Sequence, residues 1–176
     1  RAVLLLGQNF LPGVQDDLHR LLQQKLESKL LHFHEREGLF LFEDSEAKTA
    51  AQIEAADFYK QIAPGKDILQ KIVELPFRLM ISTNPDKSLV NTFAAYRQRL
   101  QFDYFSSRYK ENEYKLERPS AENPLLYNLC GSVEDQQSLI LDYDDLFKLF
   151  KTLLSNLVIP DKEVRLPLQA ARTFIF

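Results

Sequence analysis

Three short apolar runs stand out in this chain, and each one ends in a cluster of polar residues or glycine. The runs cover residues 2–6, 77–83 and 124–130. Continuous apolar runs of this length, bounded by turn-forming residues, are typical of strands that are buried on both faces of a parallel sheet. Segments with helical patterns separate them. The sequence therefore predicts an α/β fold, namely a three-layer, Rossmann-like, mostly parallel sheet with a small helical insert.

Leucines spaced four residues apart predict the first helix. Leu18, Leu22, Leu26 and Leu30 would share one face of a helix that spans residues 14–31. Segment 39–42 is expected to be a strand or part of a lid. We expect further helices at 47–62, 66–74, 87–99 and after residue 142, and further strands at 101–106, 139–141 and 172–176.

The charge balance and the single cysteine argue against several classes of protein. The chain has 22 basic and 25 acidic side chains, so nucleic acid is not an expected partner. Cys130 alone cannot form a disulfide within the chain or a zinc site built from several cysteines, and it favours a reducing, cytoplasmic location. No apolar run approaches the ~18 residues of a membrane span, so no membrane partner is expected.

The polar clusters that follow the three predicted strands are the main functional signal. They are Gly7–Asn9, Thr83–Asp86 and Cys130–Ser132. In open α/β sheets, ligands bind outside the carboxyl ends of the strands. Because parallel strands end at the same edge of a sheet, we expect the three clusters to converge into one binding site.

In this order, the three clusters resemble the motifs of bacterial sirtuin-like NAD-binding domains. Those domains have a glycine loop, commonly Gly-Ala-Gly-x-Ser, then a strand that ends in Thr-Thr-Asn-Tyr-Asp and a later strand that ends in Leu-His-Gly. The matching stretches are Leu4–Phe10, Ile81–Asp86 and Tyr127–Ser132. The resemblance extends from Val3 to Phe176, and it implies a sirtuin-like fold with NAD as the cofactor and no metal.

The resemblance also implies roles for individual residues. Backbone N–H groups of the glycine loop would approach the pyrophosphate, and Asn84 would position the attacking water beside the nicotinamide ribose. The candidate catalytic residues are Asn84, Asp86 and Cys130, which stands at the position of the family's histidine. The candidate NAD-binding residues are Gly7, Gln8, Asn9, Phe10, Thr83, Asn84, Gly131 and Ser132.

Several departures from the family pattern indicate that the catalytic apparatus has decayed. Cys130 replaces the histidine that would act as general base, and a thiol in apolar surroundings is a poor base at neutral pH. Asn9 replaces the second loop glycine, and Pro85 has no N–H to offer a ligand. The expected function is that of a NAD-type nucleotide-binding, oligomerisation or regulatory module. The alternative is a NAD glycohydrolase effector of a defence system, rather than a protein deacylase.

The chain is expected to form one sirtuin-like domain over residues 1–176, with residues 38–75 as a helical insert or lid. We expect it to be the N-terminal part of a longer bacterial protein that continues beyond the strand at 172–176. The expected partners are downstream domains of the same polypeptide, with a homo-oligomer as a further possibility.

Simpler roles remain open for several of these residues. Asn84 and Asp86 could cap the helix that follows them, Cys130 could be a small buried apolar residue, and Gly7 could serve only chain reversal. Asp142 is expected to cap the last helix.

The three histidines are not expected to be functional. His32 and His34 would share a face if they lay on a strand, as in some metal sites. Because they follow the predicted first helix, we expect a solvated helix end instead. His19 is expected to be exposed on the helix face opposite the leucines.

Overall fold

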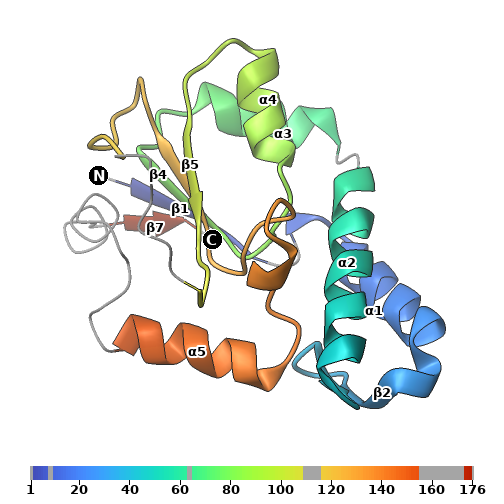
Figure 1. Ribbon diagram of the computed structural model, residues 1–176. Helices are drawn as coiled ribbons and strands as arrows, with labels where there is room; N and C mark the ends of the chain where they lie inside the picture. Colours follow the sequence, from blue (N-terminus) through green and yellow to red (C-terminus); the bar gives the residue numbers. More distant parts are fainter. Residues whose placement is uncertain (1, 8–9, 63–64, 109–115, 155–172, 176) are drawn as a thin grey trace.

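The computed structural model describes residues 2–7, 10–62, 65–108, 116–154 and 173–175 (Figure 1). Its centre is a five-stranded sheet in which every neighbouring pair of strands is parallel. The α/β class and the parallel sheet predicted from the sequence are therefore confirmed. The strands in spatial order are β5 (Gln101–Tyr104), β6 (Leu125–Asn128), β4 (Leu79–Ser82), β1 (Ala2–Leu6) and β7 (Thr173–Ile175).

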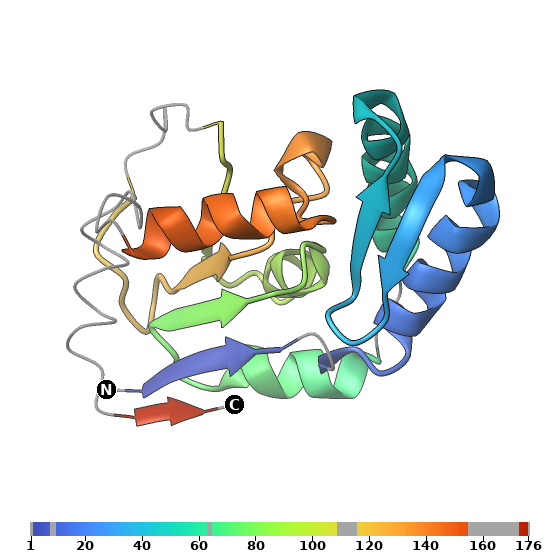
Figure 2. The ribbon, with the colours of Figure 1, turned by 90° about the horizontal axis from the view of Figure 1, so that it is seen from below.

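The register of the central strands aligns their carboxyl ends. Leu6 of β1 lies opposite Ser82 of β4, and Ser82 in turn lies opposite Asn128 of β6. All four residues of β4 and all four of β6 are buried, as expected for strands covered on both faces. Figure 2 shows that the strands of the sheet all point toward the same group of elements beyond their tips.

Helices cover both faces of the sheet and create three layers. On one face, α3 (Lys66–Glu74) and α4 (Ser88–Ala95) pack their apolar sides against alternate residues of the strands, such as Met80 and Leu126. On the other face, α5 (Tyr143–Leu154) contributes Leu149 to a core with Ile81 and Tyr127. Neighbouring residues of one strand thus belong to different cores, as the alternation of side chains along a strand requires.

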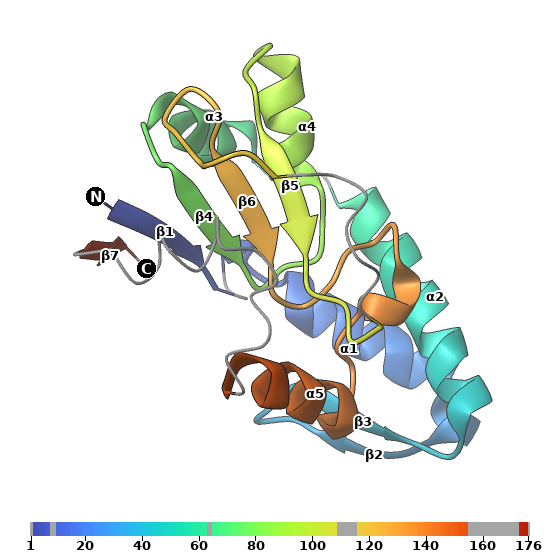
Figure 3. The same cartoon turned by 60° about the vertical axis from the view of Figure 1, so that its left-hand side comes forward.

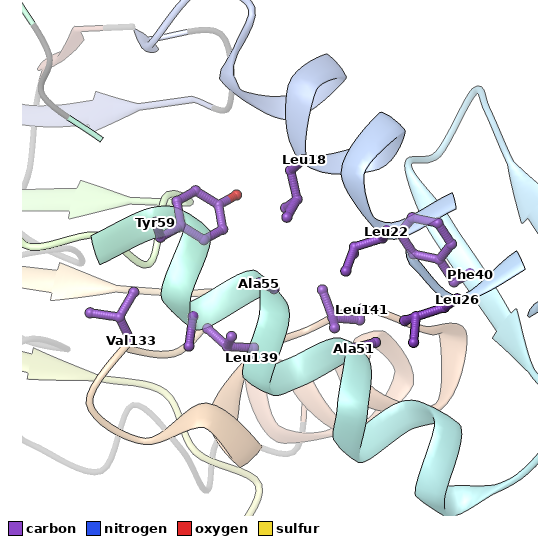
Figure 4. Packing of buried hydrophobic residues seen from close by; sticks show 11 residues of the cluster. Leu18, Leu22, Leu26, Phe40, Ala51, Ala55, Tyr59, Val133, Leu139 and Leu141 are labelled. Carbon is purple, nitrogen blue, oxygen red and sulfur yellow. The ribbon is translucent and has the colours of Figure 1, made fainter. Parts of the chain in front are cut away.

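A third core lies beyond the carboxyl ends of the strands. It is formed by α1 (Val14–Lys25), α2 (Ser45–Gln61) and an antiparallel hairpin of β2 (Leu30–His34) and β3 (Leu39–Phe42). Figure 4 shows Leu18 and Leu22 of α1 facing the small residues Ala51 and Ala55 of α2. Since alanine adds little bulk, the two helices pack closely. This core covers the edge of the sheet at which ligands of α/β proteins bind.

The first helix is shorter than the leucine spacing predicts. It ends at Lys25, and a 3-10 turn (η2, Glu27–Lys29) leads into β2. Leu26 leaves the helical conformation with φ −119° and ψ 20°. Leu30 therefore belongs to a strand and lies opposite Phe42. The prediction of a helix to residue 31 was wrong because Leu30 is half-buried in a strand that pairs with β3 rather than on a helix face.

The short strand predicted at residues 139–141 does not form. A 3-10 turn (η3, Gln136–Ser138) precedes this segment, and Leu139 is extended with ψ 132°. The backbone oxygen of Leu141 accepts one hydrogen bond from the N–H of Phe40. A single hydrogen bond to a neighbouring strand is not enough to make this extended segment a strand of the hairpin sheet. In the described part of the chain, no helix is both long and apolar enough to cross a membrane.

Candidate functional site

Two cavities lie near the carboxyl end of β4, and Thr83 lines both. The larger has a volume of about 1010 Å³ and is almost entirely apolar, with Gly7, Phe10 and Ile72 in its wall. The smaller has a volume of about 110 Å³ and lies between the sheet and the third core. The larger volume lies at the upper end of the range for ligand pockets, which are also mostly apolar.

The smaller cavity lies at a topological switch point of the sheet. After β4 the chain turns to α4 on one face, whereas after β6 it turns to α5 on the opposite face (Figure 3). The two connections diverge, so the tips of β4 and β6 border a crevice. Thr83 and Cys130, which follow these two strands, both line the cavity. Ligands of doubly wound α/β proteins bind at this kind of position.

The loop after β4 is tied to the end of β1. The backbone N–H and the hydroxyl of Thr83 both donate to the carbonyl oxygen of Leu6, at 3.0 and 3.3 Å. The side-chain amide of Asn84 donates to the carbonyl oxygen of Gly7 at 3.2 Å. Two of the three predicted clusters are therefore held against each other by direct hydrogen bonds.

Asn84 is 1% exposed, and its side-chain oxygen has no partner among the described residues. The carbonyl of Gly7 must face the NH₂ group of Asn84, so Oδ1 points away from this acceptor. The backbone N–H of Asn84 donates to Ser82 Oγ at 3.0 Å. Asn84 does not donate to or accept from the start of α4, so the capping role considered for it is not observed.

Asn128, at the tip of β6, repeats this arrangement and was not predicted. Its NH₂ group donates to the carbonyl oxygen of Asp86 at 3.3 Å, and its buried Oδ1 also has no partner within the described part of the chain. The sequence signal is an amide at the end of an otherwise apolar run. Buried amide oxygens normally accept a hydrogen bond from protein or water, so each of these two can receive a donor.

Asp86 has a structural role at the start of α4. Its Oδ1 accepts a hydrogen bond from the N–H of Ser88 at 2.7 Å. The capping alternative considered for Asp86 is therefore observed. One carboxylate oxygen is thereby committed to the backbone.

The thiol of Cys130 is half-buried in the wall of the smaller cavity. Burial raises its pKa to about 11, so it is protonated at neutral pH. Tyr59 of α2 lines the same cavity, and its hydroxyl accepts a hydrogen bond from Gln15 of α1 at 2.8 Å. Burial also raises the pKa of Tyr59. Neither of these two groups is a ready proton acceptor at neutral pH, and His19, a further titratable group, also lines the cavity.

His19 is half-buried rather than exposed as predicted. Its ring lies 4.8 Å from the ring of Phe33 and 5.7 Å from that of Phe40, measured between centroids. Gly38 adopts φ +68°, and a Cβ atom there would lie 2.9 Å from the imidazole Cε1. Burial lowers the pKa of His19, which favours its neutral form. The prediction failed because the hairpin that covers this face of α1 was not foreseen.

Gly131 and Ser132 form a tightly packed turn. Gly131 has φ +89°, and a Cβ atom there would lie 2.3 Å from the carbonyl oxygen of Ser138. The N–H of Ser132 donates to Ser138 Oγ at 2.9 Å, and Ser132 is fully buried. Packing against the backbone thus explains why residue 131 is glycine.

Gly7 differs, because neither its conformation nor its packing requires glycine. Its φ is not positive, and no atom lies within 4 Å of the position of a Cβ. It is exposed and lines the larger cavity together with Phe10. Gln8 and Asn9, the other candidates of this loop, lie outside the described residues.

No protein-family model and no curated protein matches this chain.

Proposed function

We propose that the carboxyl edge of this sheet binds a dinucleotide of the NAD type, and that the domain is a degenerate sirtuin-like, nucleotide-binding regulatory module of a larger protein. The observation that carries this proposal is that Thr83, beside the switch point between β4 and β6, lines both cavities. The resemblance of three strand-end motifs to the sirtuin-like family supplies the identity of the ligand.

The residues of the larger cavity suit the flat, weakly polar parts of a dinucleotide. Its wall combines Leu, Ile and Phe side chains with the bare backbone at Gly7. The faces of aromatic rings lose little free energy when they move from water onto an apolar wall of this kind. The open space at Gly7 would allow close approach of a ligand to the backbone, as glycines do in nucleotide-binding loops.

The hydroxyl of Thr83, which lines both cavities, suits a ribose hydroxyl or an amide group. Asn84 Oδ1 and Asn128 Oδ1 are buried acceptors without partners among the described residues, but neither residue lines either cavity. Binding of the pyrophosphate at the start of α1 is less favoured, because Asp16 and Asp17 lie in the first turn of this helix. Two carboxylates there oppose an anion and offset the favourable helix dipole.

The residue at the position of the family's histidine, Cys130, favours binding over cleavage. A general base must accept a proton at the working pH, and a thiol with a pKa of about 11 does not do so near neutrality. The alternative, a NAD glycohydrolase, draws on the resemblance of Asn84 to the family's water-positioning residue, but Asn84 is buried and lines neither cavity. An assay for free nicotinamide in the presence of NAD separates the two functions.

The test is calorimetric titration with NAD and with ADP-ribose, using the substitution Gly7→Leu. Leucine at position 7 has room in the fold and no positive φ to adopt, so the variant should fold normally. Its side chain would occupy the ligand's space, and we expect affinity to fall by about tenfold or more, or at least 1.4 kcal/mol. Gly65→Leu is the matched control, because Gly65 also has open space around its Cβ position and lies outside the wall of either cavity.

Binding by the wild type and by Gly65→Leu, with loss in Gly7→Leu, supports the proposal. Absence of heat with either ligand at millimolar concentration would reject it. Equal affinity of Gly7→Leu and the wild type would reject the placement of the ligand.

A further inference from the structure

The hairpin places two histidines side by side on one face. His32 and His34 are two residues apart on β2, and they lie opposite Leu41 and Leu39 of β3. Side chains at positions i and i+2 of a strand point to the same face. The expectation that His32 and His34 lie at a solvated helix end was therefore wrong. They lie on a strand, in the arrangement that is typical of some metal sites.

The spacing of the two imidazoles suits a shared metal ion. Their ring centroids are 4.6 Å apart, and the ring planes make an angle of 76°. A nitrogen bound to a metal lies about 2.0–2.1 Å from it, which places each ring centroid about 3.2 Å from the ion. Two such rings have centroids about 4.5 Å apart at an angle of 90° at the metal, and about 5.2 Å apart at a tetrahedral angle. The observed spacing is closest to that of adjacent positions around a tetragonal ion.

The surrounding contacts hold the pair in place and leave it open to solvent. His32 is exposed and His34 is half-buried. The ring of His34 packs edge to face against Tyr143, the first residue of α5, with centroids 4.9 Å apart. On the other face of β2, Phe33 stacks on Phe40 at 4.7 Å. The strand is thus fixed from both sides, which limits the conformational entropy that ligand binding would cost.

We propose that His32 and His34 form a binding site for a divalent transition-metal ion of the Ni²⁺ or Cu²⁺ type. Imidazole is a favoured ligand of these ions, and both accept tetragonal geometry with nitrogen and oxygen donors. No group of three or more His, Cys, Asp or Glu side chains suited to a metal occurs within the described residues, so water fills the other coordination positions. The site is independent of the proposed nucleotide site.

The chain contains three histidines, so competing imidazoles are few. The third, His19, lies against Phe33, Phe40 and the backbone of Gly38, inside the fold. Its ring belongs to the opposite side of the hairpin, as does that of Phe33. A metal that binds through imidazole at the surface should therefore depend on His32 and His34 alone.

The test is titration of the protein with Ni²⁺, followed by calorimetry, with Mg²⁺ as a cation that prefers oxygen ligands. His34→Phe keeps a ring against Tyr143 but removes the nitrogen, and His32→Gln changes an exposed position. Leu31→Gln is the control, because Leu31 is 62% exposed on the same strand. Circular dichroism of each variant reports whether the fold is retained.

We expect one Ni²⁺ per chain in the wild type and in Leu31→Gln, and no binding of Mg²⁺. Loss of either imidazole should weaken Ni²⁺ binding by at least the 10–100-fold typical of lost outer-shell contacts. Wild-type affinity in folded His34→Phe or His32→Gln, or no binding of Ni²⁺ by the wild type at millimolar concentration, would overturn the proposal.

Discussion

Arg97 is the one residue other than glycine with a positive φ in the described part of the chain. Its φ is 54°, and it follows α4. The N–H of Arg97 donates to the carbonyl of Ala94, and that of Gln98 donates to Phe93. This pattern closes the end of a helix and normally uses glycine at the left-handed position. A side chain there costs about 1–2 kcal/mol, because its Cβ approaches the following carbonyl.

Replacing Arg97 by glycine should therefore stabilise the protein. The relief of left-handed strain exceeds the extra chain entropy of glycine, which is about 0.5–1 kcal/mol. We expect the free energy of unfolding to rise by about 0.5–1 kcal/mol, measured by urea denaturation. Arg99→Gly is the control, since Arg99 is also exposed but has no positive φ. A gain in stability with Arg99→Gly that equals the gain with Arg97→Gly would contradict this explanation.

At the scale of single elements, α5 depends on one residue at its start. Asp142 Oδ1 accepts a hydrogen bond from the N–H of Asp145 at 2.9 Å, which confirms the predicted cap. Asp142 Oδ2 also lies 2.7 Å from the ammonium nitrogen of Lys48 in α2, and the same ammonium lies 2.8 Å from Asp145 Oδ2. The cap therefore also links the helix over the sheet to the helix of the third core.

Asp142→Ala should lower the free energy of unfolding by about 1–2 kcal/mol, because it removes the cap and one partner of a partly buried cation. Asp144→Ala provides the control. Asp144 lies in the same first turn but is exposed, so only a helix-dipole contribution of about 0.3–0.5 kcal/mol is lost. Urea denaturation of both variants measures the difference. Equal losses would show that α5 does not depend on the cap.

The elements that the sequence predicted best are those with strong local patterns. The strands β1, β4 and β6 are continuous apolar runs, and α3 has the predicted bounds of residues 66–74. The strand expected at 39–42 forms as β3, whereas β2 and its pairing with β3 were missed because their signal is not local. Leu30 fits the leucine repeat of α1, but it belongs to a strand because it pairs with Phe42. The ring of Phe33 stacks on that of Phe40, and local periodicity does not connect these two residues.

At the scale of the whole molecule, the candidate site is where separate parts of the fold meet. Thr83 and Cys130 follow two strands of the sheet, whereas Gln15, His19 and Tyr59 come from the third core. Strand-end motifs predicted the first two residues. The other three could not be predicted, because the hydrogen bond between Gln15 and Tyr59 spans 44 residues and depends on how α1 packs on α2.

The burial of Cys130 between the sheet and the third core makes the stability of the whole protein depend on pH. Burial raises the pKa of its thiol from an ordinary value of 9.0 to about 11 in the folded protein. Between these values the folded state holds a proton that the unfolded state has released. The contribution of Cys130 to stability is therefore complete below pH 9 and is lost as the pH rises to 11, by up to about 2–3 kcal/mol.

Comparison of the wild type with Cys130→Ala tests this dependence. Because Tyr59 is present in both proteins, the burial that raises its pKa cancels in the difference, and only the smaller contribution from the charge of Cys130 does not. We expect urea denaturation at pH 8 to 11 to show the wild type losing stability more steeply than the variant, with a difference that approaches 1.4 kcal/mol per pH unit. Parallel curves would mean that the thiol ionises equally well in the folded protein. In that case the thiol of Cys130 would be accessible to water, and the argument against its acting as a base would rest on its ordinary pKa of 9.0 alone.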